Sequence, residues 1–150
     1  MVQLKQQLYD LCLDYINQRI SNAEKAIEGA QSSANDETKS SAGDKYETGR
    51  SMMQQEAQWG RTQLVEAQKL KQDLDQIKVD TGMDTVQAGS LVYTNKGIFY
   101  IAISAGRLPV EKETVFAISA ISPLGSKLLG QKEGAGFNLN GQTFNILKVA

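Results

Sequence analysis

The chain has 150 residues, of which 22% are charged, and its formal net charge is −1. This balance excludes a strong bulk attraction to nucleic acid or to an anionic membrane. Cys12 is the single cysteine and histidine is absent, so this chain alone cannot form a disulfide, a His-ligated zinc site, or a Ser-His or Cys-His nucleophile.

The N-terminal segment MVQLKQQLYDLCLDYI does not have the pattern of a secretory signal, because Lys5, Asp10 and Asp14 interrupt it. No apolar run is long enough to span a bilayer. We therefore expect a cytoplasmic protein without a membrane partner. Cys12 lies within a helical apolar pattern, which favours a small buried hydrophobic residue over a nucleophile.

Residues 1–79 have the pattern of an antiparallel helical hairpin. They contain no proline, and apolar residues recur three and four positions apart in two stripes, joined by a polar link at about residues 35–46. An arm of about 30 residues would reach roughly 45 Å. Small residues near the link, such as Ala23, Ala30, Ala57 and Gly60, predict a close approach of the two helices there.

Residues 83–150 predict a β-rich globular domain, which makes the whole chain an α+β protein. This part holds both prolines and most of the glycines. Strands are expected over residues 85–94, 97–104, 113–119 and 137–149, the last with an Asn-Gly turn at 140–141. Between the last two lies a short helix, with Ser122 as N-cap, Pro123 at its first position and Gly130 at its end.

The polar stretch of residues 35–56, which includes the link, contains the candidate tip residues, which are Asp36, Glu37, Lys39, Asp44, Lys45, Tyr46, Glu47 and Arg50. Asp44 and Glu47 are either a capping box at the start of the second helix or a pair of metal-directed carboxylates on one face. Asp36 and Glu37 are interpreted as solvated turn acids. The basic residues either pair locally or meet phosphates of RNA or nucleotides.

Three segments of the chain resemble the bacterial Gre-type transcript-cleavage factors. VQAGSLVYT resembles that family's opening strand, in which V-x-x-G-S-x-V recurs, and ISPLGSKLLGQKEGAGFNLNGQTFNILKV resembles its closing segment. The link SAGDKYETGRSMMQQEAQ falls where the family has its hairpin tip, with Tyr46 in the place of the tip tyrosine. The similarity spans nearly the whole chain.

The resemblance implies a coiled-coil finger over residues 1–79 and a domain resembling the FK506-binding proteins over 83–150. It further implies docking at the rim of the RNA polymerase secondary channel through Ser122, Pro123, Leu124 and Gly125. The finger would enter the channel, where tip acids help to hold a Mg²⁺ ion that is shared with the polymerase. Nascent RNA would then be cut by the polymerase, so this chain would be a monomeric regulator without a stably bound cofactor and not itself an enzyme. Contact with DNA stays open.

The tip departs from the family pattern. Counting back from Tyr46, the family's three acidic positions are occupied by Lys39, Ala42 and Lys45. We therefore expect a regulator of transcription elongation that binds without strong stimulation of cleavage. The alternative is an active cleavage factor that uses the shifted acids Asp44 and Glu47.

Functions of another class are a prolyl isomerase or chaperone, and an adaptor that self-associates through its coiled coil. An isomerase would need an aromatic-lined pocket, whereas the aromatic residues of the second half alternate like core residues. Trp59 either covers the flank of the hairpin or, if it is exposed, contacts a partner. Ile121 stands where the family often carries an acid before Ser-Pro.

Overall fold

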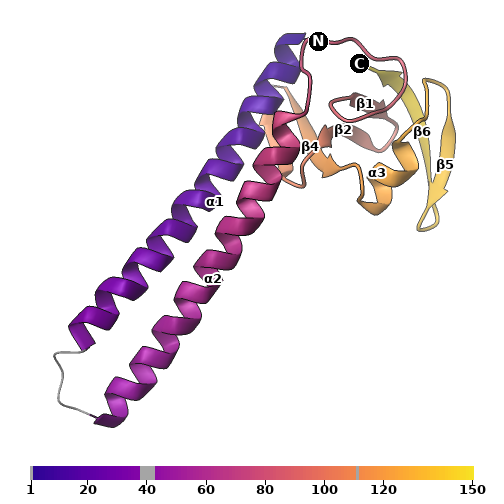
Figure 1. The fold of residues 1–150 in the computed structure, drawn as a ribbon. Helices are drawn as coiled ribbons and strands as arrows, with labels where there is room; N and C mark the ends of the chain where they lie inside the picture. Colours follow the sequence, from indigo (N-terminus) through magenta and orange to yellow (C-terminus); the bar gives the residue numbers. More distant parts are fainter. Residues whose placement is uncertain (1, 38–42, 111) are drawn as a thin grey trace. The chain divides into compact units, whose positions relative to one another are not determined.

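The structure is a computed structural model that describes residues 2–37, 43–110 and 112–150, and it describes only the backbone within 33–37 and 43–48. The chain forms two compact units (Figure 1). One unit consists of Tyr15–Lys71, and the other combines Met1–Asp14 with Gln72–Ala150. Among the described residues, no helix is long and apolar enough to cross a membrane.

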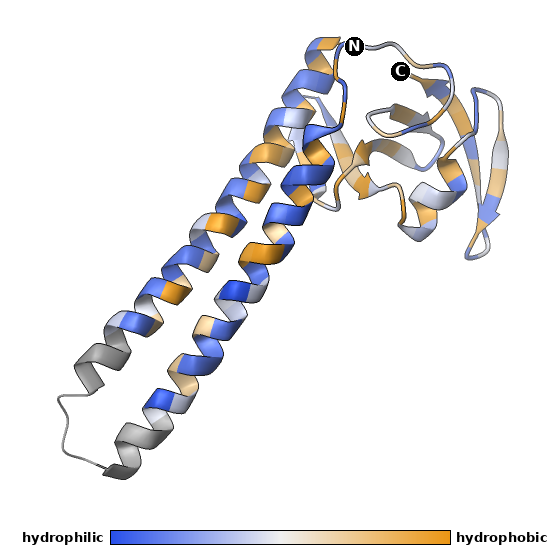
Figure 2. Cartoon of the chain, in the orientation of Figure 1, coloured by the Kyte–Doolittle hydropathy of each residue, from blue (hydrophilic) through white to orange (hydrophobic). Residues whose placement is uncertain are grey.

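The predicted helical hairpin is confirmed by two long helices. Helix α1 spans Val2–Glu37 and helix α2 spans Gly43–Asp75. Apolar residues recur along both helices on a largely hydrophilic background (Figure 2). This pattern places one apolar stripe of each helix in the seam between them.

Small residues line the seam of the hairpin, as the sequence predicted. Ala23 and Ala30 of α1 are buried, and Ala57 and Gly60 of α2 are buried with them. A Cβ atom added to Gly60 would lie 2.9 Å from the Ala23 carbonyl oxygen and 2.8 Å from Cγ1 of Ile27. The two helices therefore approach so closely at this point that only glycine fits without a shift.

One polar cluster crosses the hairpin. The Arg19 guanidinium of α1 donates hydrogen bonds to Oε1 of Gln63 at 2.7 Å and to Oε2 of Glu66 at 3.0 Å, both on α2. These partly exposed contacts fix the register of the two helices more than they stabilise them.

The unit that combines Met1–Asp14 with Gln72–Ala150, which we call the sheet unit, contains a six-stranded mixed sheet with strand order β3-β4-β2-β1-β6-β5. The unit Tyr15–Lys71 is called the hairpin unit. Strands β2 and β4 are parallel, and the other neighbouring pairs are antiparallel. The strands are β1 (Leu91–Thr94), β2 (Gly97–Ala102), β3 (Gly106–Val110), β4 (Glu113–Ser119), β5 (Gly136–Leu139) and β6 (Gln142–Val149), and the short helix α3 spans Pro123–Leu128.

The sheet corrects one strand prediction and contains one strand that was not predicted. The strand expected over residues 85–94 begins only at Leu91, because Gly89 has a φ of 92° and the Ser90 hydroxyl accepts a hydrogen bond from the Gln87 amide in a turn. Strand β3 was missed, since its Gly106 and Pro109 weaken any strand pattern. The Asn-Gly turn between β5 and β6 is confirmed by positive φ values at Asn140 and Gly141.

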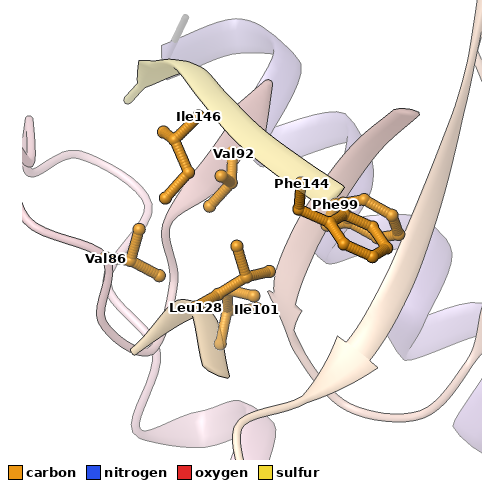
Figure 3. Packing of buried hydrophobic residues seen from close by; sticks show 7 residues of the cluster. All are labelled: Val86, Val92, Phe99, Ile101, Leu128, Phe144 and Ile146. Atoms are coloured by element: carbon orange, nitrogen blue, oxygen red, sulfur yellow. The ribbon is translucent and has the colours of Figure 1, made fainter. Parts of the chain in front are cut away.

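Seven buried residues form a hydrophobic cluster in the sheet unit, which we call the main core. They converge from the segment before β1, from β1, β2 and β6, and from α3 (Figure 3). They are Val86, Val92, Phe99, Ile101, Leu128, Phe144 and Ile146. Because side chains alternate along a strand, Tyr100 points to the opposite face, where its neighbours in register are Leu91 and Ala117.

Candidate functional site

Residues 119–126 form a turn that we call the serine turn, and it leads into α3. Ser122 is the N-cap, since its hydroxyl oxygen accepts a hydrogen bond from the Gly125 amide at 3.0 Å, and Pro123 follows at the first helical position. The same hydroxyl donates to the Ser119 carbonyl at 2.6 Å. The predicted helix start is therefore confirmed, and the Ser122 hydroxyl is engaged both as donor and as acceptor.

Further hydrogen bonds hold the serine turn in one conformation. The Ile121 amide donates to the Ser119 hydroxyl at 3.2 Å, and the Ser126 amide donates to the Ser122 carbonyl at 2.8 Å. Gly125 is required by the packing, because a Cβ atom there would collide with the Ser119 carbonyl oxygen. The turn therefore holds its exposed side chains in fixed positions.

The four predicted docking residues differ in accessibility. Pro123 is exposed, Ser122 and Leu124 are half-buried, and Gly125 is buried. Leu124 packs against the main core. Of these four, Pro123 is therefore the one whose side chain lies on the open surface.

Ile121 is the residue of the serine turn that protrudes most. Its side chain is 90% exposed, the largest exposure among the exposed large hydrophobic residues described for this chain. Sequence reasoning treated Ile121 only as a missing acid. The signal that pointed to exposure was its place in a turn, between the end of a strand and an N-cap.

Most tip predictions fall on side chains that the structure does not describe. Asp36, Glu37, Lys39, Asp44, Lys45, Tyr46 and Glu47 all lie outside the described side chains. Helix α2 begins at Gly43, which places Asp44 inside the first turn and not ahead of it. The predicted capping box, which needs Asp44 as the N-cap, is therefore wrong, whereas the metal pair remains a prediction.

Arg50 is described and exposed, and it lines a hollow of about 250 Å³ on the hairpin unit. Ala30, Met53 and Ala57 contribute apolar lining, and Gln31, Gln54 and Arg61 contribute polar groups. The Arg61 guanidinium donates to Oε1 of Gln58 at 3.3 Å. Two guanidinium groups beside amide side chains are suited to bind an anion such as a phosphate.

Trp59 is 51% exposed on α2. Its exposure favours the second of the two interpretations, in which Trp59 contacts a partner. Met52 lies seven residues earlier on the same helix and is 65% exposed. A spacing of seven residues places both side chains on one helical face.

Cys12, Lys5 and Tyr100 are buried ionisable residues of the sheet unit. Burial raises the pKa of the Cys12 thiol to about 12, which fits the expected buried hydrophobic residue. Burial also lowers the pKa of Lys5, whose Nζ donates to the Thr81 carbonyl at 3.2 Å. The Tyr100 hydroxyl is buried without a hydrogen-bond partner among the described residues.

Within the described part of the chain, no group of three or more Cys, Asp or Glu residues could hold a metal ion.

No family model matches the chain, and no curated protein matches it. One solved structure, described as "Structure of the transcription factor Gfh1", aligns with 94% of this chain and 92% of that chain. Its sequence identity is 15% and its TM-score is 0.33. A TM-score this low does not assign a family or a function.

Proposed function

We propose that the chain regulates transcription elongation by binding bacterial RNA polymerase at its secondary channel. In this proposal the helical hairpin enters the channel, and the serine turn contacts the rim. The proposal is supported by the resemblance of VQAGSLVYT, of the Ser-Pro segment and of the closing strands to the Gre-type factors. The α+β combination of a helical hairpin and a mixed sheet is compatible with it.

The observation that carries the proposal is the closely packed helical hairpin. Helix α1 has 36 residues and α2 has 33, which corresponds to a rod of about 50 Å. At Gly60 the helices leave no room for a Cβ atom beside the Ala23 carbonyl, so the rod is thin near its middle. A long, thin rod is what a protein needs to reach the bottom of a deep and narrow channel.

The rim contact is proposed to be apolar. The hydroxyl of Ser122 is engaged within the serine turn, so a hydrogen bond to a partner would have to compete with existing ones. Ile121 and Pro123, in contrast, are exposed on a rigid turn. Rigid, exposed apolar side chains lose little conformational entropy on binding and are typical anchors of interfaces.

The tip is proposed to occupy the channel without recruiting a metal ion. Lys39 and Lys45 stand where the family carries acids, and cations there would repel Mg²⁺. They would attract the phosphates of RNA or of an incoming nucleotide, as would Arg50 and Arg61 in the hollow of the hairpin unit. The chain would then slow or modulate the polymerase by competing for the channel, with no catalytic group of its own.

A binding titration against core RNA polymerase tests the docking. The wild-type chain should bind, and Ile121→Asp should weaken binding by about tenfold because a charge replaces an apolar anchor. Pro123→Ala should weaken it less. The matched control is Leu147→Asp, which changes another exposed hydrophobic residue of the same unit, on β6. A wild-type chain that does not bind polymerase would end the proposal.

An RNA-shortening assay in stalled, backtracked complexes tests the tip. The expected result is little or no cleavage above that of polymerase alone. Robust cleavage that disappears in the double variant Asp44→Ala/Glu47→Ala would show that the alternative is correct and that shifted acids hold Mg²⁺.

The functions of another class have weaker support. Phe99 and Phe144 are buried in the main core, and the ring of Phe137 stacks on that of Phe144 with 5.2 Å between the ring centroids. These aromatic residues therefore pack against one another and do not line a proline pocket. An adaptor that self-associates would use the exposed Trp59 and Met52. Sedimentation of a stable monomer would count against the adaptor.

A further inference from the structure

The turn between β5 and β6 presents an asparagine in an unusually unprotected state. Asn140 and Gly141 are both exposed, and the chain has its single Asn-Gly pair here. Among the described residues, neither the Asn140 side-chain amide nor the Gly141 amide has a hydrogen-bond partner. A Cβ atom added to Gly141 would meet nothing within 4 Å, so the space beside this residue is open.

We infer that Asn140 is a site of spontaneous deamidation that acts as a slow, one-way modification of the sheet unit. The Gly141 nitrogen attacks Cγ of Asn140, a new C–N bond closes a cyclic imide, and the Cγ–Nδ2 bond breaks. The Gly141 amide proton leaves with the side-chain nitrogen as ammonia. Water then opens the imide at either carbonyl, which yields aspartate or isoaspartate at position 140. The step needs water and no oxidant.

The backbone at this turn decides how fast the ring can close. Asn140 has a φ of 52° and Gly141 a φ of 79°, the values of a two-residue type I′ turn. Ring closure requires this turn to relax. The relaxation disturbs little, because β5 is the last strand of the sheet and pairs with β6 alone. Edge hairpins of this kind open locally without unfolding the core.

Asn138 is a matched control within the same hairpin. It is also exposed, but its Oδ1 accepts a hydrogen bond from the Thr143 hydroxyl at 2.7 Å, and Leu139 follows it. The side chain of Leu139 obstructs the approach of the following amide, and the hydrogen bond holds the side chain of Asn138 in place. Asn138 should therefore keep its amide while Asn140 loses it.

The two products differ in their effect on the hairpin. Aspartate keeps the length of the main chain, whereas isoaspartate adds a methylene group to it between Leu139 and Gln142, which are partners in register. A longer turn cannot hold the register that pairs Phe137 with Phe144 and stacks their rings. Since Phe144 belongs to the main core, the isoaspartyl form should be less stable than the original protein.

The experiment follows the full-length protein during incubation at neutral and mildly alkaline pH. Peptide mass spectrometry measures amide loss at each asparagine, and a carboxyl methyltransferase specific for isoaspartate measures the second product. The expected result is that amide loss at Asn140 clearly exceeds that at Asn138, and that methyl-accepting sites accumulate with it. The aged protein should also show a lowered melting temperature.

Asn140→Gly is the control variant, because a Gly-Gly pair also fits a type I′ turn and cannot form the imide. It should fold, should not accumulate methyl-accepting sites at this turn and should keep its melting temperature on ageing. Amide loss at Asn140 that is no faster than at Asn138 would overturn the inference. Equal accumulation of methyl-accepting sites in Asn140→Gly would also overturn it, because the reactive site would then lie elsewhere.

Discussion

Replacing Gly60 with alanine gives the most specific test of how closely the two helices of the hairpin pack. In the interior of an exposed helix, replacing glycine with alanine normally stabilises by about 1 kcal/mol. At Gly60 the added Cβ would lie 2.9 Å from the Ala23 carbonyl oxygen, which belongs to the backbone of the other helix and cannot rotate away. The Ile27 side chain on the same helix as Ala23 is as close, with its Cγ1 at 2.8 Å.

The sign of Gly60→Ala therefore depends on which of two effects is larger. Forcing one extra methyl group into a close-packed interface costs about 1–3 kcal/mol. The gain in helix propensity recovers about 1 kcal/mol. We expect a net destabilisation of about 1 kcal/mol, because the seam can widen only by moving two long helices apart.

Gly29→Ala is the matched control on the other helix of the same unit. Gly29 is exposed, and an added Cβ would meet nothing within 4 Å. Gly29→Ala should therefore stabilise the helix by about 1 kcal/mol through helix propensity, with no steric cost to oppose it. Thermal melting followed by far-ultraviolet circular dichroism should show a lower melting temperature for Gly60→Ala and a higher one for Gly29→Ala. If both variants raise it equally, the helices do not approach as the structure has them.

Three further predictions concern packing and ionisation. Gly125→Ala should destabilise the sheet unit by about 2 kcal/mol or more in denaturant titrations, because its Cβ would collide with the Ser119 carbonyl oxygen. Leu64→Asp should cost about 2 kcal/mol and lower the helix signal, because a charge replaces a half-buried seam residue. Cys12 should resist alkylation in the folded protein. Burial raises the pKa of the Cys12 thiol to about 12. The contribution of Cys12 to the free energy of unfolding is therefore complete below the ordinary thiol pKa, and it is lost as the pH rises from there towards about 12. A free energy of unfolding that stays constant across that range would contradict this prediction.

Local sequence patterns were sufficient for the helical hairpin and for the start of α3. Helical periodicity over some thirty residues leaves few alternatives, and the alanines and Gly60 of the seam were recognisable from their size and spacing. Ser122 and Pro123 form a cap whose geometry is set by neighbouring residues alone. In each case the interactions that form the element lie within the segment that predicts it.

Strand β3 shows why the sheet could be predicted only in part. Gly106 and Pro109 disfavour a strand, and most of β3 is exposed, so no alternation of apolar and polar residues marks it. Its single buried anchor is Leu108, which is 5% exposed and pairs with Val115 of β4. Pro109 is tolerated because β3 is an edge strand. Pairing with β4 thus creates the strand, and pairing is a property of the fold that a local pattern does not contain.

The candidate docking site, too, could be located from a local pattern, whereas its accessible groups could not be predicted. The Ser-Pro pattern located the serine turn, yet which of its groups can reach a partner depends on hydrogen bonds across the turn. Because the Ser119 carbonyl and the Gly125 amide engage the Ser122 hydroxyl, the one polar side chain among the four predicted docking residues is already satisfied. The same bonds hold the turn that leaves Ile121 exposed. If this turn docks, its contribution is therefore burial of apolar surface, which salt screens little, whereas any contribution of the lysines near the tip is electrostatic and weakens with salt.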